Sequence, residues 1–276
     1  MGVIAGAFAT SHVLMAPEGI EDQARRIYEG MKEIGRRVRA ARPDVLVIVS
    51  SDHLMNFKLD LQVPFVVGAA DAYEPWGDMD IPKSSFFGQR EFAEGLLAYA
   101  WEQGIDIAKA AELRPDHGVA IPNAIVNPDG RIPVVPLFIN TAMTPVPSPG
   151  RGWALGDLLR RYVATMRPPG ERVVLLGAGG LSHWICMDRQ GEVNTQWDHW
   201  IMDMIIAGRG AELAALTSAE ILERGGNGGL EVINWICMAG AVPGACGERI
   251  YYEPVPEWLT GMGGIAMHVD PLAAGA

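Results

Sequence analysis

The stretch DVLVIVSSDH, residues 44–53, places five aliphatic residues in a row before a polar turn that ends at His53. A short run of this kind, mostly β-branched, is typical of a strand buried on both faces of a sheet. The same order recurs at the N-terminus, where the apolar segment 2–10 precedes Ser11 and His12. The sequence therefore predicts two buried strands that each end at a polar turn carrying a histidine.

The rest of the chain alternates between strand-like and helix-like segments, and no linker or solenoid repeat interrupts the alternation. Further strands are expected at 64–69, 134–140, 172–176 and 264–269, and helices at 18–41, 89–103, 153–166, 196–207, 218–224 and 230–239. This order predicts one α/β domain over residues 1–276, with a central, mostly buried sheet flanked by helices. In such folds functional groups gather in the loops after strand ends.

Composition excludes several classes of protein. With 49% hydrophobic and 20% charged residues the chain is expected to fold around a core, and its net charge of -11 argues against a nucleic-acid partner. The apolar N-terminus lacks the cationic start of a signal peptide, and the apolar stretch 232–241 is well short of the roughly 20 residues that span a membrane. Three cysteines without CxxC spacing fit a reducing compartment. We expect a cytoplasmic protein with no membrane partner.

Histidine placement is the main clue to chemistry. Four of the six histidines stand in short polar turns after apolar runs: His12, His53, His117 and His183. Iron(II) enzymes that activate oxygen commonly hold the metal with two imidazoles and one carboxylate. Glu231 is a lone charge in the apolar helical stretch 230–239, and burying an unpaired carboxylate costs several kcal/mol, so a metal partner would explain it. A simple role in complementing a helix dipole explains Glu231 equally well.

Five short motifs, in this order, resemble those of the class III (LigB-type) extradiol ring-cleavage dioxygenases. That family includes the protocatechuate 4,5-dioxygenase catalytic subunit and 2,3-dihydroxyphenylpropionate dioxygenase. Trp197-Asp198 before a helix and the segment 251–258 extend the resemblance over most of the chain. The five motifs are Ser11-His12, Ser51-Asp52-His53, Asp116-His117-Gly118, Gly179-Gly180-Leu181-Ser182-His183 and Gly229-Leu230-Glu231.

The resemblance implies a site and a reaction. His12, His53 and Glu231 would bind Fe(2+), while His183 and His117 would stand beside the substrate as catalytic residues. A catechol similar to protocatechuate, gallate or dihydroxyphenylpropionate would be opened by O2, as in the catabolism of aromatic and lignin-derived compounds. His183 would take one catechol proton and return it later, since imidazole exchanges protons near neutral pH. His117 would stabilise the charge that develops after oxygen binds.

Further expectations concern the substrate pocket and partners. Trp184, Tyr251, Tyr252 and Arg114 are candidate substrate-binding residues, and a homo-oligomer is expected. The resemblance also allows a small second subunit, as in the protocatechuate enzymes. Two alternatives stay open at this point. A zinc-dependent hydrolase would use the same two histidines and carboxylate, and a metal-binding protein without activity would share the fold.

Overall fold

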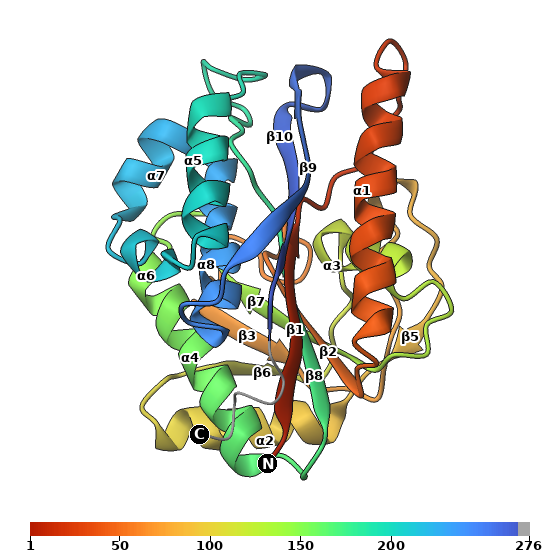
Figure 1. Cartoon of the computed structure of the whole chain (residues 1–276), viewed down its shortest axis with the longest axis vertical. Helices are drawn as coiled ribbons and strands as arrows, with labels where there is room; N and C mark the ends of the chain where they lie inside the picture. The colour runs from red at the N-terminus through yellow and green to blue at the C-terminus, as the bar shows by residue number, and fades with distance from the viewer. Residues whose placement is uncertain (270–276) are drawn as a thin grey trace.

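Eight strands form the sheet at the centre of the computed structural model, which describes residues 1–269 (Figure 1). Residues 270–276 of the expected domain lie outside this description. In sheet order the strands are β6 (Ala108–Ala110), β3 (Phe65–Gly68), β7 (Val134–Ile139), β2 (Val45–Ser50), β8 (Arg172–Ala178), β1 (Val3–Thr10), β10 (Thr260–Met267) and β9 (Gly247–Val255). The predicted α/β class with a central, mostly buried sheet is confirmed.

The middle of the sheet is parallel. Strands β7, β2, β8 and β1 run in one direction, while β3 pairs antiparallel with β7, and β10 pairs antiparallel with both β1 and β9. Thr10 at the end of β1 lies opposite Ala178 at the end of β8, and Val49 of β2 lies opposite Gly177. The loops that follow these three strands therefore leave the sheet at the same edge.

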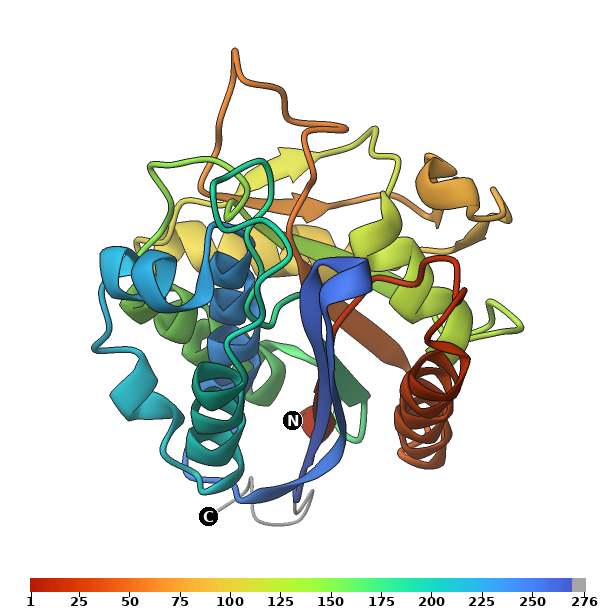
Figure 2. The ribbon, with the colours of Figure 1, turned by 90° about the horizontal axis from the view of Figure 1, so that it is seen from above.

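Helices cover both faces of the sheet. Helices α1 (Glu21–Ala40) and α3 (His117–Val126) pack on one face, and the other α-helices lie on the opposite side, as the view from above shows (Figure 2). The helices on the opposite side are α2 (Arg90–Glu102), α4 (Pro149–Met166), α5 (Thr195–Ile206), α6 (Gly210–Leu213), α7 (Ser218–Gly225) and α8 (Val232–Ala241).

Strand β2 is apolar without interruption over residues 45–49. All six of its residues are buried, and successive side chains point to opposite faces. Val47 joins the core beneath α4 and α8, whereas Ile48 joins the core beneath α1 and α3. Each such side chain stabilises the fold by about 1.5–3 kcal/mol relative to exposure. A strand covered by helices on both sides needs this continuous apolar pattern.

Several element boundaries differ from the sequence expectations. Helix α4 begins at Pro149, before the expected residue 153, because the Ser148 hydroxyl accepts the Arg151 N–H and proline suits the first helical turn. The segment expected as one helix at 230–239 divides into the 3-10 turn η2 (Gly228–Glu231) and α8. Strands β9 and β6 and helix α3 were not predicted. The interior Pro122 of α3 hid its helical pattern.

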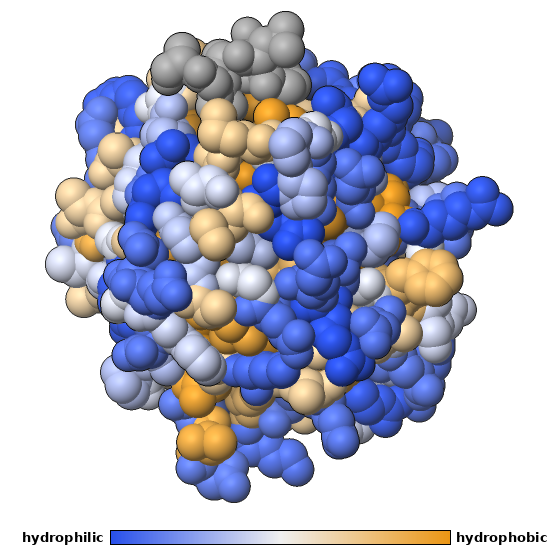
Figure 3. All heavy atoms as spheres, turned by 90° about the horizontal axis from the view of Figure 1, so that it is seen from below, coloured by the Kyte–Doolittle hydropathy of each residue, from blue (hydrophilic) through white to orange (hydrophobic). Residues whose placement is uncertain are grey.

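Smaller elements complete the chain: the two-stranded pair β4 (Ala72–Tyr73) and β5 (Phe86–Phe87), and the 3-10 turns η1 (Asp78–Asp80) and η3 (Pro256–Trp258). Within residues 1–269 no helix combines the length and apolar character needed to cross a bilayer. The face at the bottom of Figure 1 carries mainly hydrophilic residues, with apolar ones scattered among them (Figure 3).

Candidate metal centre and active site

The common edge of the parallel strands brings the sequence motifs together. His12 follows β1, His53 follows β2, and the turn that contains Gly180 follows β8. Glu231 approaches from the end of η2, and its Oε2 accepts the backbone N–H of Gly180 at 2.7 Å. Gly179 allows this approach because its φ is +126° and a Cβ would lie 2.8 Å from Glu231 Cβ.

Two histidine side chains converge on one carboxylate oxygen of Glu231. Nε2 of His53 lies 2.9 Å from Oε1 of Glu231, and Nε2 of His12 lies 3.5 Å from the same oxygen. His12 and Glu231 are 2% and 5% exposed, so the cluster sits below the surface. His117 joins it, since ligand atoms of His12, His53 and His117 all lie within 4.8 Å of one another. The geometry thus offers Glu231 or His117 as the third ligand beside His12 and His53.

Asp116 orients His53. Its Oδ2 accepts the backbone N–H of His53 at 2.7 Å and lies 3.1 Å from Nδ1 of the ring. A proton on Nδ1 leaves a lone pair on Nε2 of the neutral ring, which then faces the Glu231 carboxylate. Two acceptors at this distance repel unless a proton or a cation lies between them. A carboxylate that fixes a histidine from behind is the usual support of a metal-binding imidazole.

The pKa values of the cluster agree with a site built for positive charge. Burial opposes a charge on His53, but Asp116 and Glu231 outweigh it and raise the pKa of His53 well above its ordinary value. Burial lowers the pKa of His12 to about 3, although Glu231 acts in the opposite direction. Burial alone would raise the pKa of Glu231, yet His12 and His53 hold it below its usual range. Two imidazoles and an ionised carboxylate fit a divalent transition metal.

His117 is the first residue of α3 and is held from outside the cluster. Its Nδ1 lies 2.6 Å from Oδ2 of Asp78, and its ring centroid lies 4.0 Å from that of His53. Asp116 caps the same helix by accepting the Gly118 N–H at 3.0 Å. One aspartate therefore supports both His53 and the helix that presents His117.

His183 lies against the turn that carries Glu231. Its Nδ1 is 2.9 Å from the carbonyl oxygen of Leu181, and since a carbonyl only accepts, Nδ1 carries a proton. In the neutral ring Nε2 is then the acceptor. A Cβ on Gly228 would lie 1.9 Å from this Nε2. The ring is thus packed on Gly228 of η2, three residues before Glu231.

Trp184 and Arg114, two candidates for substrate binding, already have partners. Trp184 is 3% exposed, and the Arg189 guanidinium lies 4.0 Å above its ring. Arg114 donates to Glu74 at 2.9 Å and stacks on the ring of Trp76 at 4.7 Å. Within residues 1–269 neither side chain is hydrogen-bonded to a motif histidine, and their roles toward a substrate stay predictions.

The two tyrosines also point to other partners. The hydroxyl of Tyr251 lies 2.8 Å from Oγ1 of Thr10, and that of Tyr252 donates to Oδ2 of Asp198 at 2.8 Å. Both phenol hydroxyls are hydrogen-bonded to protein side chains. Substrate binding by either tyrosine therefore also stays a prediction. Asp198 connects Tyr252 to the turn before His183, which gives this tyrosine a structural relation to the site.

Sequence reasoning missed the residues that support the ligands. Asp116 stands beside His117 in its motif, so its position was visible, but its contact with His53 depends on the fold. Asp78 begins the short 3-10 turn η1, and the sequence around it gives no signal of this contact. Asn234, one turn after Glu231, donates to the Ala178 carbonyl at 2.8 Å and so ties α8 to the end of β8.

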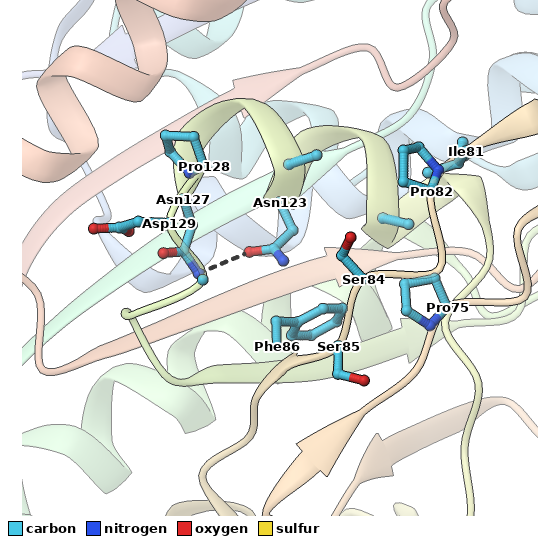
Figure 4. Close-up of a pocket in the computed structure, with 13 residues that line it drawn as sticks. Pro75, Ile81, Pro82, Ser84, Ser85, Phe86, Asn123, Asn127, Pro128 and Asp129 are labelled. Atoms are coloured by element: carbon cyan, nitrogen blue, oxygen red, sulfur yellow. Dashed lines mark hydrogen bonds between the residues drawn. The ribbon is translucent and has the colours of Figure 1, made fainter.

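A separate cavity of about 270 Å³ lies between the segment 75–86 and the later turns of α3 (Figure 4). Asn123 and Asn127 line it, and Nδ2 of Asn127 donates a hydrogen bond to Oδ1 of Asn123 at 3.1 Å. The four histidines of the motifs do not line this cavity. We therefore place the chemistry at the histidine cluster.

Comparison with known proteins identifies the family. The family model described as the catalytic LigB subunit of aromatic ring-opening dioxygenase matches residues 6–263. The chain belongs to the LigB family. The resemblance drawn from the five motifs is confirmed, and with it the enzyme class, an extradiol ring-cleaving dioxygenase.

Two relatives of this LigB protein share one type of name. A 2,3-dihydroxyphenylpropionate/2,3-dihydroxicinnamic acid 1,2-dioxygenase of Photorhabdus laumondii is 30% identical over 89% of this chain and 90% of its own length. A protein of the same name from Pseudomonas putida is 28% identical over 84% and 88%. A solved structure of an uncharacterized Escherichia coli K12 protein, 17% identical, superposes with a TM-score of 0.63 over 95% of this chain and 99% of its own. That likeness shows the fold alone.

Proposed function

We propose that this LigB protein is a non-haem Fe(II)-dependent extradiol dioxygenase acting on a catechol similar to dihydroxyphenylpropionate, with protocatechuate-like and gallate-like catechols as the other candidates. The observation that carries the proposal is the convergence of His12 Nε2 and His53 Nε2 on Oε1 of Glu231. The names of the relatives favour the propionate side chain. The same three donors suit zinc, but membership of a dioxygenase family favours oxygen chemistry over hydrolysis.

His12, His53 and Glu231 would hold the iron, which supplies a Lewis acid for the catechol oxygens and a centre for O2 activation. Asp116 keeps the proton of His53 on Nδ1, so that Nε2 is free as a ligand. The Gly180 N–H fixes Oε2 of Glu231 and leaves Oε1 turned toward both histidines. These contacts set the ligand positions before any metal arrives.

His183 and His117 would act on the catechol. Because the Leu181 carbonyl accepts from Nδ1 of His183, its Nε2 can take a proton from a catechol hydroxyl and return it at product formation. Asp78 orients His117 through Nδ1, which leaves Nε2 for hydrogen bonding to charge that builds on the substrate. A homo-oligomer, a small second subunit and a cytoplasmic location stay predictions.

The experiment that tests the function is anaerobic reconstitution with iron(II), followed by oxygen uptake on a panel of catechols. The panel holds 2,3-dihydroxyphenylpropionate, protocatechuate, gallate and unsubstituted catechol. We expect oxygen consumption with a yellow ring-opened product and the highest kcat/KM on the propionate. No uptake with any catechol, together with tightly held zinc, would overturn the proposal in favour of a hydrolase.

Replacing Gly228 by alanine should lower kcat roughly 100-fold without loss of iron, because a misplacement of about 1 Å in a catalytic group can cost this much. The added Cβ would lie 1.9 Å from His183 Nε2, so the ring has to move. Gly229→Ala is the matched control, since its Cβ would meet nothing closer than 3.7 Å. Steady-state kinetics and iron content decide the matter. Equal losses in both variants would show that the turn, and not the His183 ring, is disturbed.

A further inference from the structure

We propose that Asp198 is a positioning residue that acts through Ser182 to hold His183 in place with its proton on Nδ1. The role of His183 as the base rests on the function proposed above. The position of its proton is a property of the protein alone. The two can therefore be tested separately.

Asp198 sits at the first turn of α5 and receives three hydrogen bonds. Its Oδ1 accepts the backbone N–H of Ser182 at 2.8 Å, and its Oδ2 accepts the Ser182 hydroxyl at 3.0 Å and the Tyr252 hydroxyl at 2.8 Å. The Ser182 hydroxyl in turn accepts the backbone N–H of Asn194 at 2.8 Å. The carboxylate thus joins α5, β9 and the turn that ends at His183.

Every backbone polar group of residues 181–183 has a partner. Leu181 N–H donates to the Gly261 carbonyl at 2.8 Å, and the Gly261 N–H donates to the Ser182 carbonyl at 3.0 Å. His183 N–H donates to the Gly225 carbonyl at 2.8 Å, and its carbonyl accepts the Gly228 N–H at 3.2 Å. The Ser182 N–H and the Leu181 carbonyl remain, and their partners are Asp198 and the His183 ring.

The last two bonds are coupled by geometry. Asp198 fixes the peptide plane between Leu181 and Ser182, because the N–H of that plane is the group it binds. The carbonyl of the same plane is the acceptor for Nδ1 of His183. Its direction decides which ring nitrogen carries the proton. A neutral amide in place of the carboxylate weakens the hydrogen bond to this N–H, because hydrogen bonds to an ionised acceptor are the stronger ones. The plane can then turn and withdraw the carbonyl that keeps the proton on Nδ1.

Burying the Asp198 carboxylate costs folding free energy, and packing alone does not explain why a carboxylate stands at this position. The residue is 0% exposed, and within residues 1–269 no ion pair reaches it. Burial raises its pKa to about 6 against the effect of its Ser182 and Tyr252 bonds. A buried carboxylate held only by neutral donors destabilises the fold relative to a well-packed apolar residue. Gly261 makes room for it, since a Cβ there would lie 2.1 Å from Oδ2.

The test uses Asp198→Asn in the metal-free full chain. Nitrogen NMR of histidine-labelled protein reports the protonated ring nitrogen directly, and the His183 signals are assigned with His183→Gln. Wild type should show His183 with its proton on Nδ1. Asp198→Asn should show a mixture of the two tautomers or the Nε2-protonated form. Tyr162→Phe, which loses a buried 2.9 Å bond to the Phe92 carbonyl far from the site, should leave the His183 signals unchanged.

Kinetics supply a second reading. With iron loaded, Asp198→Asn should lower kcat by about 10- to 100-fold with little change in KM or iron content, as expected for a residue that orients a catalytic group. Ser182→Ala and Tyr252→Phe each remove one hydroxyl donor to Asp198 and should have smaller effects. They replace Asp198→Asn in the test if that variant fails to fold. An unchanged His183 tautomer in all folded variants would overturn the inference. An altered tautomer in a protein that cleaves no catechol would instead overturn the proposed function alone.

Discussion

Replacing Glu231 by alanine should abolish stoichiometric iron binding and lower ring-cleaving activity by about 1,000-fold or more. The variant removes the oxygen on which His12 Nε2 and His53 Nε2 converge. A bound metal contributes several kcal/mol of transition-state stabilisation, and every 1.36 kcal/mol corresponds to about a factor of ten in rate. Anaerobic equilibrium dialysis measures the iron, and oxygen uptake with the best catechol of the panel measures the activity.

The matched control is Glu94→Ala, which removes a carboxylate from a solvent-exposed ion pair with Lys109 and should change neither reading. The same experiment on His117→Ala separates the two ligand sets that the geometry allows. We expect His117→Ala to keep its iron and lose turnover. Loss of iron from His117→Ala, with retention in Glu231→Ala, would show that the three histidines form the metal site.

The fold could be predicted from the sequence because buried parallel strands appear as continuous apolar runs. The residues of β2 must be apolar on both faces, and the turn with His53 follows directly, so one segment predicted both a strand and a candidate ligand. Strand β9 was not predicted, for the opposite reason. It is an edge strand with several exposed or half-buried residues, and its pattern shows no continuous apolar run.

Site residues could be predicted from the sequence only where they stand in a motif. Glu231 could be singled out because a lone charge in an apolar helix needs an explanation, and the Gly180 N–H and two histidines now provide it. Asp78 could not be found, since its contact with His117 joins positions 39 residues apart through a loop. Tyr252 stays a candidate for substrate binding, and the contact of its hydroxyl with Asp198 could not be predicted from the sequence. Sequence shows which residues are unusual, whereas only the fold shows what they touch.

Replacing His183 by glutamine should lower kcat by about 100- to 10,000-fold, the usual contribution of a general acid or base, while iron content and KM change little. Glutamine can still donate an amide N–H to the Leu181 carbonyl, so the turn keeps its shape, but no group remains that takes a proton in place of Nε2. The dependence of kcat/KM on pH should therefore lose the limb that reports this base. His268→Gln is the control, since His268 is exposed and its Nε2 lies 3.5 Å from Oε1 of Glu248.

The pattern of loss decides what His183 does. If kcat stays within about twofold of wild type, the catechol proton must leave by another route, and His117 becomes the base. If KM rises while kcat holds, His183 binds the substrate equally in ground and transition states and takes no part in proton transfer. A fall in kcat alone, with iron in place and the pH limb gone, requires the Nε2 lone pair that the Leu181 carbonyl preserves. Glu231 and His183 then have separate roles, in which the carboxylate binds the metal and the imidazole transfers the proton.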